Sequence, residues 1–215
     1  MNIGSYTSKI YTQLKEELIN STYPHNEFIT EKEVAERFGS SKTPARESLN
    51  QLCIEGFLEK IPYKGYLIKK FSYQELKQIF QFRQIIEVAS IELAVKQASA
   101  ADINYLWSLC DEVDKMNEIT DLKIYNDINQ RFHIEIAKIS QNTYLVDVLS
   151  NIMNLMRRPL IIDLKLSSGQ VLLAPHKKII EMIESKDVEG AIETTREHLN
   201  KAEKRIFEKN IFDNI

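Results

Sequence analysis

Residues 30–68 constrain the fold most, because two helix signals are followed at once by a β signal. Thr30 and Glu33 have the spacing of a capping box, in which each side chain bonds the other residue's free backbone N–H at a helix start. Gly39 can adopt the left-handed conformation that ends a helix, and Ser41 can start a second one. The sequence therefore predicts two short helices joined by a tight turn.

The second of these helices has an apolar side and a polar side. Leu49 and Leu52 lie on the apolar side, which leaves Lys42, Thr43 and Arg46 on the outer side near the helix N-terminus. Side chains in this position of a recognition helix meet base edges and phosphates of DNA. The pattern therefore favours double-stranded DNA as a partner.

A β-hairpin is predicted directly after the second helix. Phe57–Ile61 and Tyr66–Lys70 are β-prone runs, and Pro62-Tyr-Lys-Gly65 joins them with a glycine turn. The tip is basic, since from Lys60 to Lys70 there are lysines and no acidic residue. Together these segments predict a winged helix-turn-helix. The alternative is a small helical domain whose lysines form an ordinary solvated surface.

Three runs in this segment carry a family resemblance: Ser41-Lys-Thr-Pro-Ala-Arg-Glu-Ser-Leu49, Leu52-x-x-Glu-Gly-Phe-Leu58 and Lys64-Gly-Tyr66. They resemble the N-terminal domain of GntR-family bacterial transcription regulators, over about residues 6–71. The resemblance implies DNA contacts at Lys32, Ser41, Lys42, Thr43 and Arg46, with Lys64 and Gly65 reaching the minor groove from the wing tip. The family often has arginine where Lys42 stands. Lysine lacks the two-pronged contact to guanine, so Lys42 is expected mainly to position phosphates.

The charge balance limits how tightly one such domain can bind DNA. Residues 1–71 carry 10 Lys+Arg and 9 Asp+Glu, a net charge of +1, and the remainder carries −4, which together give the whole-chain value of −3. Non-specific attraction to DNA is therefore modest. We expect a homodimer that places two such domains on a roughly palindromic operator.

The sequence indicates two domains, at residues 1–71 and 72–215. After Phe71 the sequence has only two glycines, Gly169 and Gly190, and no β-type alternation of apolar and polar residues. The predicted fold class is therefore mainly α, with an N-terminal winged helix-turn-helix plus a C-terminal all-α helical bundle. Six helices are expected in the bundle, over Ser72–Gln97, Ala101–Ile119, Leu122–Ile139, Thr143–Leu166, Pro175–Glu184 and Val188–Lys209. No apolar signal core or bilayer-length run is present, which predicts a cytoplasmic protein without a membrane partner.

Three of the four histidines lie on three different predicted helices of the bundle. His133, His176 and His198 each stand on or beside an apolar stripe and could point inward. Imidazole is a common ligand of zinc, nickel and manganese ions, and three imidazoles leave coordination positions open. The alternative is that the three histidines are buried and satisfied by ordinary hydrogen bonds.

The second domain also resembles a known domain, through Arg83-x-x-x-Glu87, Phe132-His133, Ser140-Gln-Asn142, Pro175-His176 and His198-Leu199. It looks like the FadR-type C-terminal ligand-binding domain called FCD, over essentially all of residues 72–215. The resemblance implies a divalent metal ion held by the three histidines and an aspartate four residues before the first, with a small organic acid completing the shell. Asn129 stands in the aspartate position. An amide oxygen can bind metal but lacks the charge, so weaker binding is expected.

Two arginines are candidates for the effector. The resemblance places Arg83 at the pocket, where a guanidinium could bind a carboxylate in two-pronged geometry. Arg83 and Glu87 are also one helical turn apart and could simply pair. Arg157, on the longest inner helix, could reach the ligand as well.

The sequence is therefore interpreted as a DNA-binding transcription regulator, in which residues 1–71 bind DNA and residues 72–215 dimerise and bind an organic-acid effector. No catalysis is expected. Two alternatives stay open: a metal-dependent hydrolase or lyase built on the three histidines, and a regulator whose effector pocket holds no metal. The hydrolase alternative lacks a His-Glu-x-x-His, Gly-x-Ser-x-Gly or phosphate-loop motif.

Overall fold

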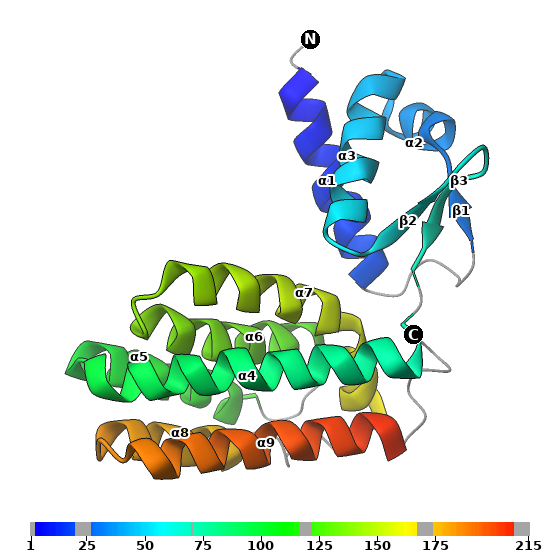
Figure 1. The fold of residues 1–215 in the computed structure, drawn as a ribbon. Coiled ribbons are helices and arrows are strands. Elements are labelled where there is room, and N and C mark those ends of the chain that lie inside the picture. The colour runs from blue at the N-terminus through cyan, green and yellow to red at the C-terminus, as the bar shows by residue number, and fades with distance from the viewer. Residues whose placement is uncertain (1–2, 20–26, 70, 117–121, 167–173, 209–215) are drawn as a thin grey trace. The chain divides into compact units, whose positions relative to one another are not determined.

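The computed structural model describes residues 3–19, 27–69, 71–116, 122–166 and 174–208. The chain divides into two compact units, Met1–Phe71 and Ser72–Asn214, and each is described by itself. In Figure 1 the first unit runs from blue to cyan and the second from green to red. The predicted fold class is confirmed, because the sheet of the described residues belongs to the first unit and the second is helical.

In the first unit three helices pack together, and a small sheet lies beside them against α3. Helix α3 packs against α1, α2 and β2, and its buried Leu49 and Leu52 meet Leu14 of α1 in the core. Helix α2 starts with the predicted capping box of Thr30 and Glu33, and it ends at Gly39 with φ 59°. The elements are α1 (Ile3–Ile19), β1 (Phe28–Ile29), α2 (Glu31–Phe38), α3 (Lys42–Ile54), β2 (Leu58–Ile61) and β3 (Gly65–Ile68).

The sheet has the strand order β1-β3-β2 with antiparallel pairing throughout. The β2–β3 hairpin was predicted, and Lys70, the expected end of its second strand, lies outside the described residues. Strand β1 was not predicted, because two residues are too short to show β alternation. Gly65 has φ 117°, and a Cβ at this position would lie 2.8 Å from the carbonyl oxygen of Ile29. The pairing of β1 with β3 therefore requires glycine at position 65.

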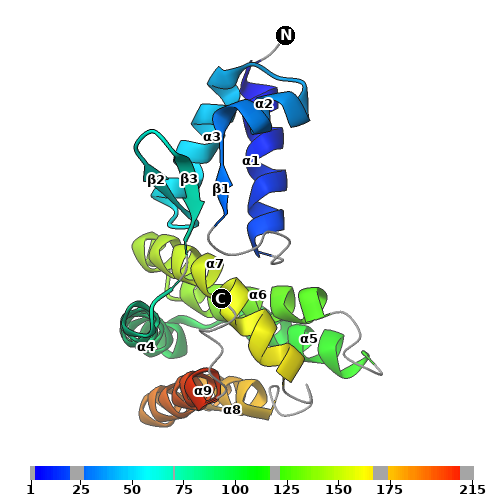
Figure 2. The same ribbon diagram turned by 90° about the vertical axis from the view of Figure 1, so that its right-hand side faces the viewer.

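The second unit is a bundle built around its longest helix. Helix α4 packs along α9 on one side and against α6 and α7 on the other, while α5 packs on α6 and α8. Figure 2 shows α4 nearly end-on, with α6 and α7 above it and α9 below it. The helices are α4 (Tyr73–Gln97), α5 (Ala100–Asp114), α6 (Leu122–Ile139), α7 (Thr143–Leu166), α8 (Ala174–Glu184) and α9 (Val188–Glu208). None of the described helices is both long and apolar enough to cross a bilayer.

The predicted helix bounds agree closely with these, except at the end of α5. This helix was expected to continue to Ile119 but ends at Asp114. Its last turns carry Asp111, Glu112 and Asp114, whose negative charges are unfavourable at the negative end of the helix dipole. Ile119 itself, like Lys209 at the expected end of α9, lies outside the described residues.

Candidate functional site

Helix α3 presents one buried and one exposed side in the first unit. Pro44, Ala45, Ser48, Leu49 and Leu52 are buried. Lys42, Thr43 and Arg46 are exposed, as their expected role requires. Because the buried residues anchor α3 in the core, the exposed ones are held on a rigid helix.

The N-terminus of α3 adds polar groups to this surface. Ser41 occupies the N-cap position, yet its hydroxyl makes no capping hydrogen bond and is exposed. The uncapped backbone N–H groups at a helix start favour anions such as phosphate. Lys32 of α2 is also exposed, and its 3.8 Å ion pair with Glu36 is weak, because the two side chains are 72% and 67% exposed.

Tyr66 of the β2–β3 hairpin joins the hairpin to helices α2 and α3. The Tyr66 hydroxyl lies within hydrogen-bond distance of Glu31 Oε1 (3.0 Å) and Asn50 Oδ1 (3.1 Å). Burial, followed by the hydrogen bond to Glu31, raises the pKa of Tyr66 to about 12, so the hydroxyl keeps its proton. Lys64 is exposed at the hairpin tip, with Nζ 5.9 Å from the centroid of the Phe28 ring. These hydrogen bonds of Tyr66 therefore hold the wing in place against α2 and α3.

In the second unit the three histidines meet in the core. His133 comes from α6, His176 from α8 and His198 from α9, and each has a ring nitrogen within 4.8 Å of the others. They are 2%, 2% and 8% exposed, so water does not solvate the rings. The three residues named from the sequence are therefore brought together by three separate helices.

The tautomer and ring orientation of His133 are set by a carboxylate from α4. His133 Nδ1 lies 2.6 Å from Glu87 Oε2, so Nδ1 carries the proton and donates it to this oxygen. The other ring nitrogen, Nε2, is buried and lacks a hydrogen-bond partner among the described residues. A histidine that donates from one nitrogen to a carboxylate and leaves the other bare has the arrangement typical of a metal ligand.

The rings of His176 and His198 meet edge to face, and their Nε2 atoms point toward each other. His176 Nε2 and His198 Nε2 are 3.2 Å apart, close to the roughly 3.3 Å that separates two nitrogen ligands on one tetrahedral zinc ion. Phe132 stacks on His176 with ring centroids 4.2 Å apart. Burial holds the pKa of both histidines well below the ordinary value. Neutral imidazole is the form that binds metal, so the residues fit a divalent ion.

Glu87 also binds a buried arginine one turn earlier on α4. Arg83 Nε donates to Glu87 Oε1 at 2.5 Å, and the two side chains are 2% and 6% exposed. Burial alone raises the pKa of Glu87, but the charge of Arg83 and the hydrogen bonds from His133 and Arg83 outweigh it, so the pKa lies well below its ordinary value. The carboxylate is therefore ionised and links the arginine to the histidine cluster.

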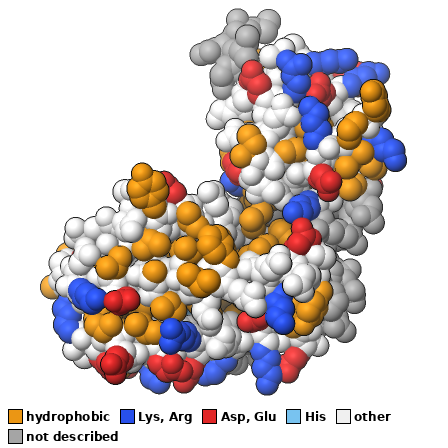
Figure 3. Space-filling model, viewed as in Figure 1, with side chains coloured by type: hydrophobic (Ala, Val, Ile, Leu, Met, Phe, Trp, Pro, Cys, Tyr) orange, Lys and Arg blue, Asp and Glu red, His pale blue; other side chains and the backbone are white. Residues whose placement is uncertain are grey.

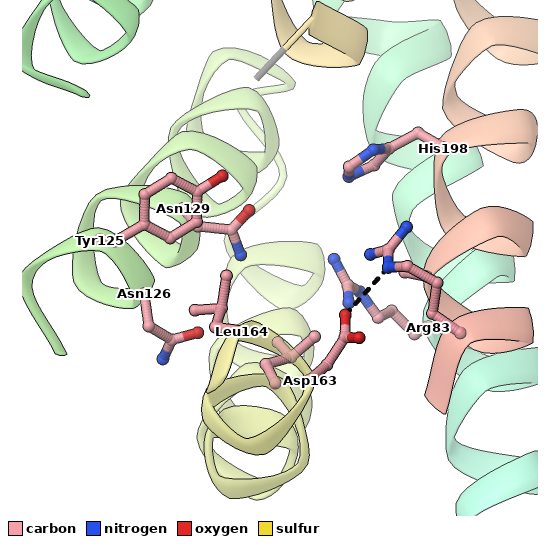
Figure 4. Close-up of a pocket in the computed structure, with 10 residues that line it drawn as sticks. Arg83, Tyr125, Asn126, Asn129, Asp163, Leu164 and His198 are labelled. Atoms are coloured by element: carbon pink, nitrogen blue, oxygen red, sulfur yellow. Dashed lines mark hydrogen bonds and ion pairs between the residues drawn. The ribbon is translucent and has the colours of Figure 1, made fainter. Parts of the chain in front are cut away.

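A cavity of about 30 Å³ lies beside this network, between α4, α6, α7 and α9. In Figure 4, Tyr125, Asn126 and Asn129 of α6 lie across from Arg83 and His198, and Asp163 and Leu164 of α7 lie below. Tyr125 and Asn126 are buried, and their Oη and Oδ1 atoms lack partners among the described residues. The cavity thus contains polar atoms that a ligand or a water molecule could satisfy.

Some of the predicted effector and metal residues line the cavities of the second unit, and Arg157 does not. Arg83, Asn129 and His198 line one cavity, and Asn129 also borders a smaller one of about 10 Å³ with His176. Arg157 lies apart, because it pairs with Asp127 and does not line either cavity. An effector contact by Arg157 therefore finds no support in this geometry and stays a prediction.

Several site residues were missed by the sequence analysis. Glu87 was noted only as a partner of Arg83, and its bond to His133 joins residues 46 positions apart. Tyr125 and Asn126 stand within one turn of Asn129 on α6, and this spacing could have indicated them. The ion pair between Asp163 and Arg205 (3.1 Å), which also lines the cavity, has no comparable signal in the sequence.

Comparison with known families matches both units. Residues 6–68 match the family described as "Bacterial regulatory proteins, gntR family", and residues 78–201 match the family described as "FCD domain". The chain is 27% identical over 198 residues to the HTH-type transcriptional regulator YdhC of Bacillus subtilis, covering 91% of this chain and 88% of that protein. It is 27% identical over 203 residues to the HTH-type transcriptional repressor GlaR of Escherichia coli, covering 88% and 90%.

Solved structures show the same fold. The structure of McbR/YncC from E. coli superposes with a TM-score of 0.79 at 20% identity, covering 95% of this chain and 98% of that chain. A GntR-type regulator from Rhodococcus sp. RHA1 superposes with a TM-score of 0.77 at 15% identity, with the same coverage. At these identities the likeness concerns the fold.

Proposed function

The chain belongs to the GntR family of bacterial transcriptional regulators and carries an FCD domain, and from this premise we propose that it is a cytoplasmic homodimer whose operator binding responds to a small organic acid. Residues 1–71 bind one half of a roughly palindromic DNA duplex. Residues 72–215 dimerise, hold a divalent metal ion and bind the effector. The relatives above are named as regulators and not as enzymes, so the hydrolase or lyase alternative gains nothing from them.

The exposed side of α3 is the observation that best supports DNA binding. Lys42 and Arg46 stand one turn apart and reach solvent, while the opposite side of the helix is fixed in the core. An arginine contacts guanine with two hydrogen bonds, and a lysine contacts phosphate through its charge. We assign base reading to Arg46, phosphate contacts to Ser41, Lys42, Thr43 and Lys32, and minor-groove contacts to the wing-tip residues Lys64 and Gly65.

The bare Nε2 of His133 is the observation that best supports the metal site. A buried acceptor without a partner is costly, and a cation bound there would remove that cost. His176 and His198 supply further neutral nitrogens, and Asn129 would complete the set with an amide oxygen. A bound zinc, nickel or manganese ion would act as a Lewis acid that attracts an effector carboxylate.

The cavity residues indicate what the effector carries. Arg83 lines the cavity and offers its remaining guanidinium N–H groups to a carboxylate, although its Nε pairs with Glu87. Tyr125 Oη can also donate to a carboxylate. Asn126 Oδ1 only accepts, and a carboxylate cannot satisfy it, so the effector is a small acid with a hydroxyl group. The volume of about 30 Å³ has room for about two water molecules, which limits the effector to a small molecule.

An apolar stripe on α4 supports the homodimer. Phe82 and Ile85 are 48% and 65% exposed, and the half-buried Ala89 and Leu93 continue the stripe at helical spacing. Figure 3 shows apolar side chains gathered over α4 and α7 on this face of the second unit. A contiguous apolar surface of this kind is covered in a stable protein, and a second copy of α4 is the occupant we propose.

DNA binding is tested with a fluorescently labelled duplex that the wild-type protein selects in vitro from a random-sequence pool. Arg46→Ala should weaken binding to this duplex by about tenfold or more per half-site, since one bidentate base contact is lost. Arg196→Ala, an exposed arginine of α9, is the control and should bind as the wild type does. Equal binding by both variants would contradict the assignment of α3.

A further inference from the structure

The tip of the wing holds an aromatic residue in a backbone conformation that such residues avoid. Tyr63 has φ 64°, in the left-handed region that is uncommon for residues other than glycine and unfavourable for a bulky one. The Lys64 N–H donates to the Ile61 carbonyl oxygen at 3.2 Å, which makes residues 61–64 a turn. Tyr63 stands third, after Pro62, at the position where a type II turn usually takes glycine.

Contacts within the protein do not explain this choice of residue. The Tyr63 side chain is wholly exposed, at 109% of its reference area, so its ring packs on none of the described residues. Lys186 is a useful contrast, because it also has a positive φ (58°) but donates from Nζ to the carbonyl oxygens of Val95 and Ala98 at 2.9 Å. The hydrogen bonds of Lys186 offset its backbone strain, whereas the exposed Tyr63 side chain makes no contact among the described residues that would offset its own.

The surroundings of Tyr63 indicate what its ring contacts. Lys60 and Lys64 are exposed on the same hairpin, with Nζ atoms 5.4 Å and 5.9 Å from the ring centroids of Tyr66 and Phe28. An exposed aromatic ring on the same hairpin as two exposed lysines fits the nucleic-acid backbone, where lysines meet phosphates and an aromatic ring lies on sugars or base edges. A strained, exposed residue of this kind suggests a binding role.

We propose that the Tyr63 ring inserts into the minor groove of the operator and packs on its sugars, as a DNA contact in addition to those of α3. The inference rests on the proposed function, because it requires that the first unit binds DNA. It differs from a lysine contact in one measurable respect. A ring displaces no counterions, so its loss lowers affinity without changing the salt dependence of binding.

The test is Tyr63→Gly in the full-length protein, which should change stability and DNA affinity in opposite directions. Glycine relieves the left-handed strain, so the melting temperature of the first unit should rise by about 1–5 °C. Affinity for the duplex selected by the wild type should fall by about fivefold or more, the typical loss for a stacking aromatic. Tyr63→Phe keeps the ring and should retain both wild-type values.

Lys64→Gln is the matched control on the same hairpin. It should also weaken binding, but it should reduce the slope of log affinity against log salt by about one unit, while Tyr63→Gly leaves that slope unchanged. Wild-type affinity in Tyr63→Gly, or a lower melting temperature, would overturn the inference. Failure of the wild-type protein to select any duplex would instead overturn the proposed function.

Discussion

Replacing Glu87 by glutamine should destabilise the second unit strongly, because one carboxylate neutralises a buried arginine and orients a buried histidine. Glu87 accepts from Arg83 Nε at 2.5 Å and from His133 Nδ1 at 2.6 Å. Glutamine has nearly the same shape but one carbonyl oxygen and no charge, so one of the two donors loses its acceptor. Arg83 keeps its charge at 2% exposure, where water does not reach it.

The magnitude follows from this burial. Removing one partner of a buried ion pair costs about 3–5 kcal/mol, because it leaves an uncompensated buried charge. For a domain of this size, each kcal/mol lowers the melting temperature by about 2–4 °C, so we expect a decrease of about 6–20 °C. Urea unfolding followed by circular dichroism gives the free energy, and the protein is first treated with chelator so that bound metal does not add stability.

The same helix offers a matched control in the pair of Glu92 and Lys96. This pair has the same four-residue spacing, but its side chains are 48% and 53% exposed. Glu92→Gln should therefore cost less than about 0.5 kcal/mol. If Glu87→Gln and Glu92→Gln cost the same, the buried network does not stabilise the fold as argued here. Glu87→Leu combined with Arg83→Met removes both charges and should recover most of the loss.

The variant also reports on the metal site, because Glu87 fixes the tautomer of His133. Loss of an outer-shell carboxylate typically lowers metal affinity by about 10–100-fold. Zinc titration against a competing chelator should show this decrease for Glu87→Gln and wild-type affinity for Glu92→Gln. Unchanged zinc affinity in Glu87→Gln would mean that His133 is not a ligand.

Three further outcomes are expected. In zinc-loaded protein, calorimetry should show tighter binding of glycolate than of acetate, and Asn126→Leu should abolish the difference; equal binding by wild type would refute the hydroxyl contact but not carboxylate binding. Gly65→Ala should destabilise the first unit by about 2 kcal/mol or more in urea unfolding, because Cβ would meet the Ile29 carbonyl at a positive φ. Burial raises the pKa of the Cys110 thiol to about 11, so iodoacetamide at pH 8 should modify half-buried Cys53 first, and the reverse order by mass spectrometry would contradict this burial.

The parts of the fold that the sequence predicted are those set by local signals. The capping box of Thr30 and Glu33 and the left-handed Gly39 depend on residues a few positions apart, and both occur as expected. Helices α6 and α7 begin and end at the predicted residues, Leu122–Ile139 and Thr143–Leu166. Such features need no knowledge of the distant chain, so a single sequence carries them.

The parts that it did not predict depend on contacts between distant segments. Strand β1 exists because Phe28 and Ile29 pair with β3 almost forty residues later. For Arg83 the sequence left two roles open, an ion pair with Glu87 or a contact in the pocket. The structure shows that Arg83 pairs with Glu87 and also lines the cavity, because a guanidinium has donors for both. Spacing alone could not reveal that the same carboxylate continues to His133.

Helix α4 carries the proposed effector contact and the proposed dimer contact on neighbouring residues. Arg83 and Glu87 are buried on its inner side, while Phe82 and Ile85 are exposed on the other. A ligand that draws Arg83 into the cavity therefore acts on the same two turns that a second copy would contact.

Linkage then requires reciprocity: if glycolate changes the affinity of the protein for the selected duplex by some factor, the duplex must change its affinity for glycolate by the same factor. Ile85→Glu should separate the dimer. It should weaken duplex binding and abolish this coupling, while each protomer still binds glycolate. Coupling that survives in the monomer, measured by calorimetry with and without duplex, would show that the signal does not pass through paired α4 helices.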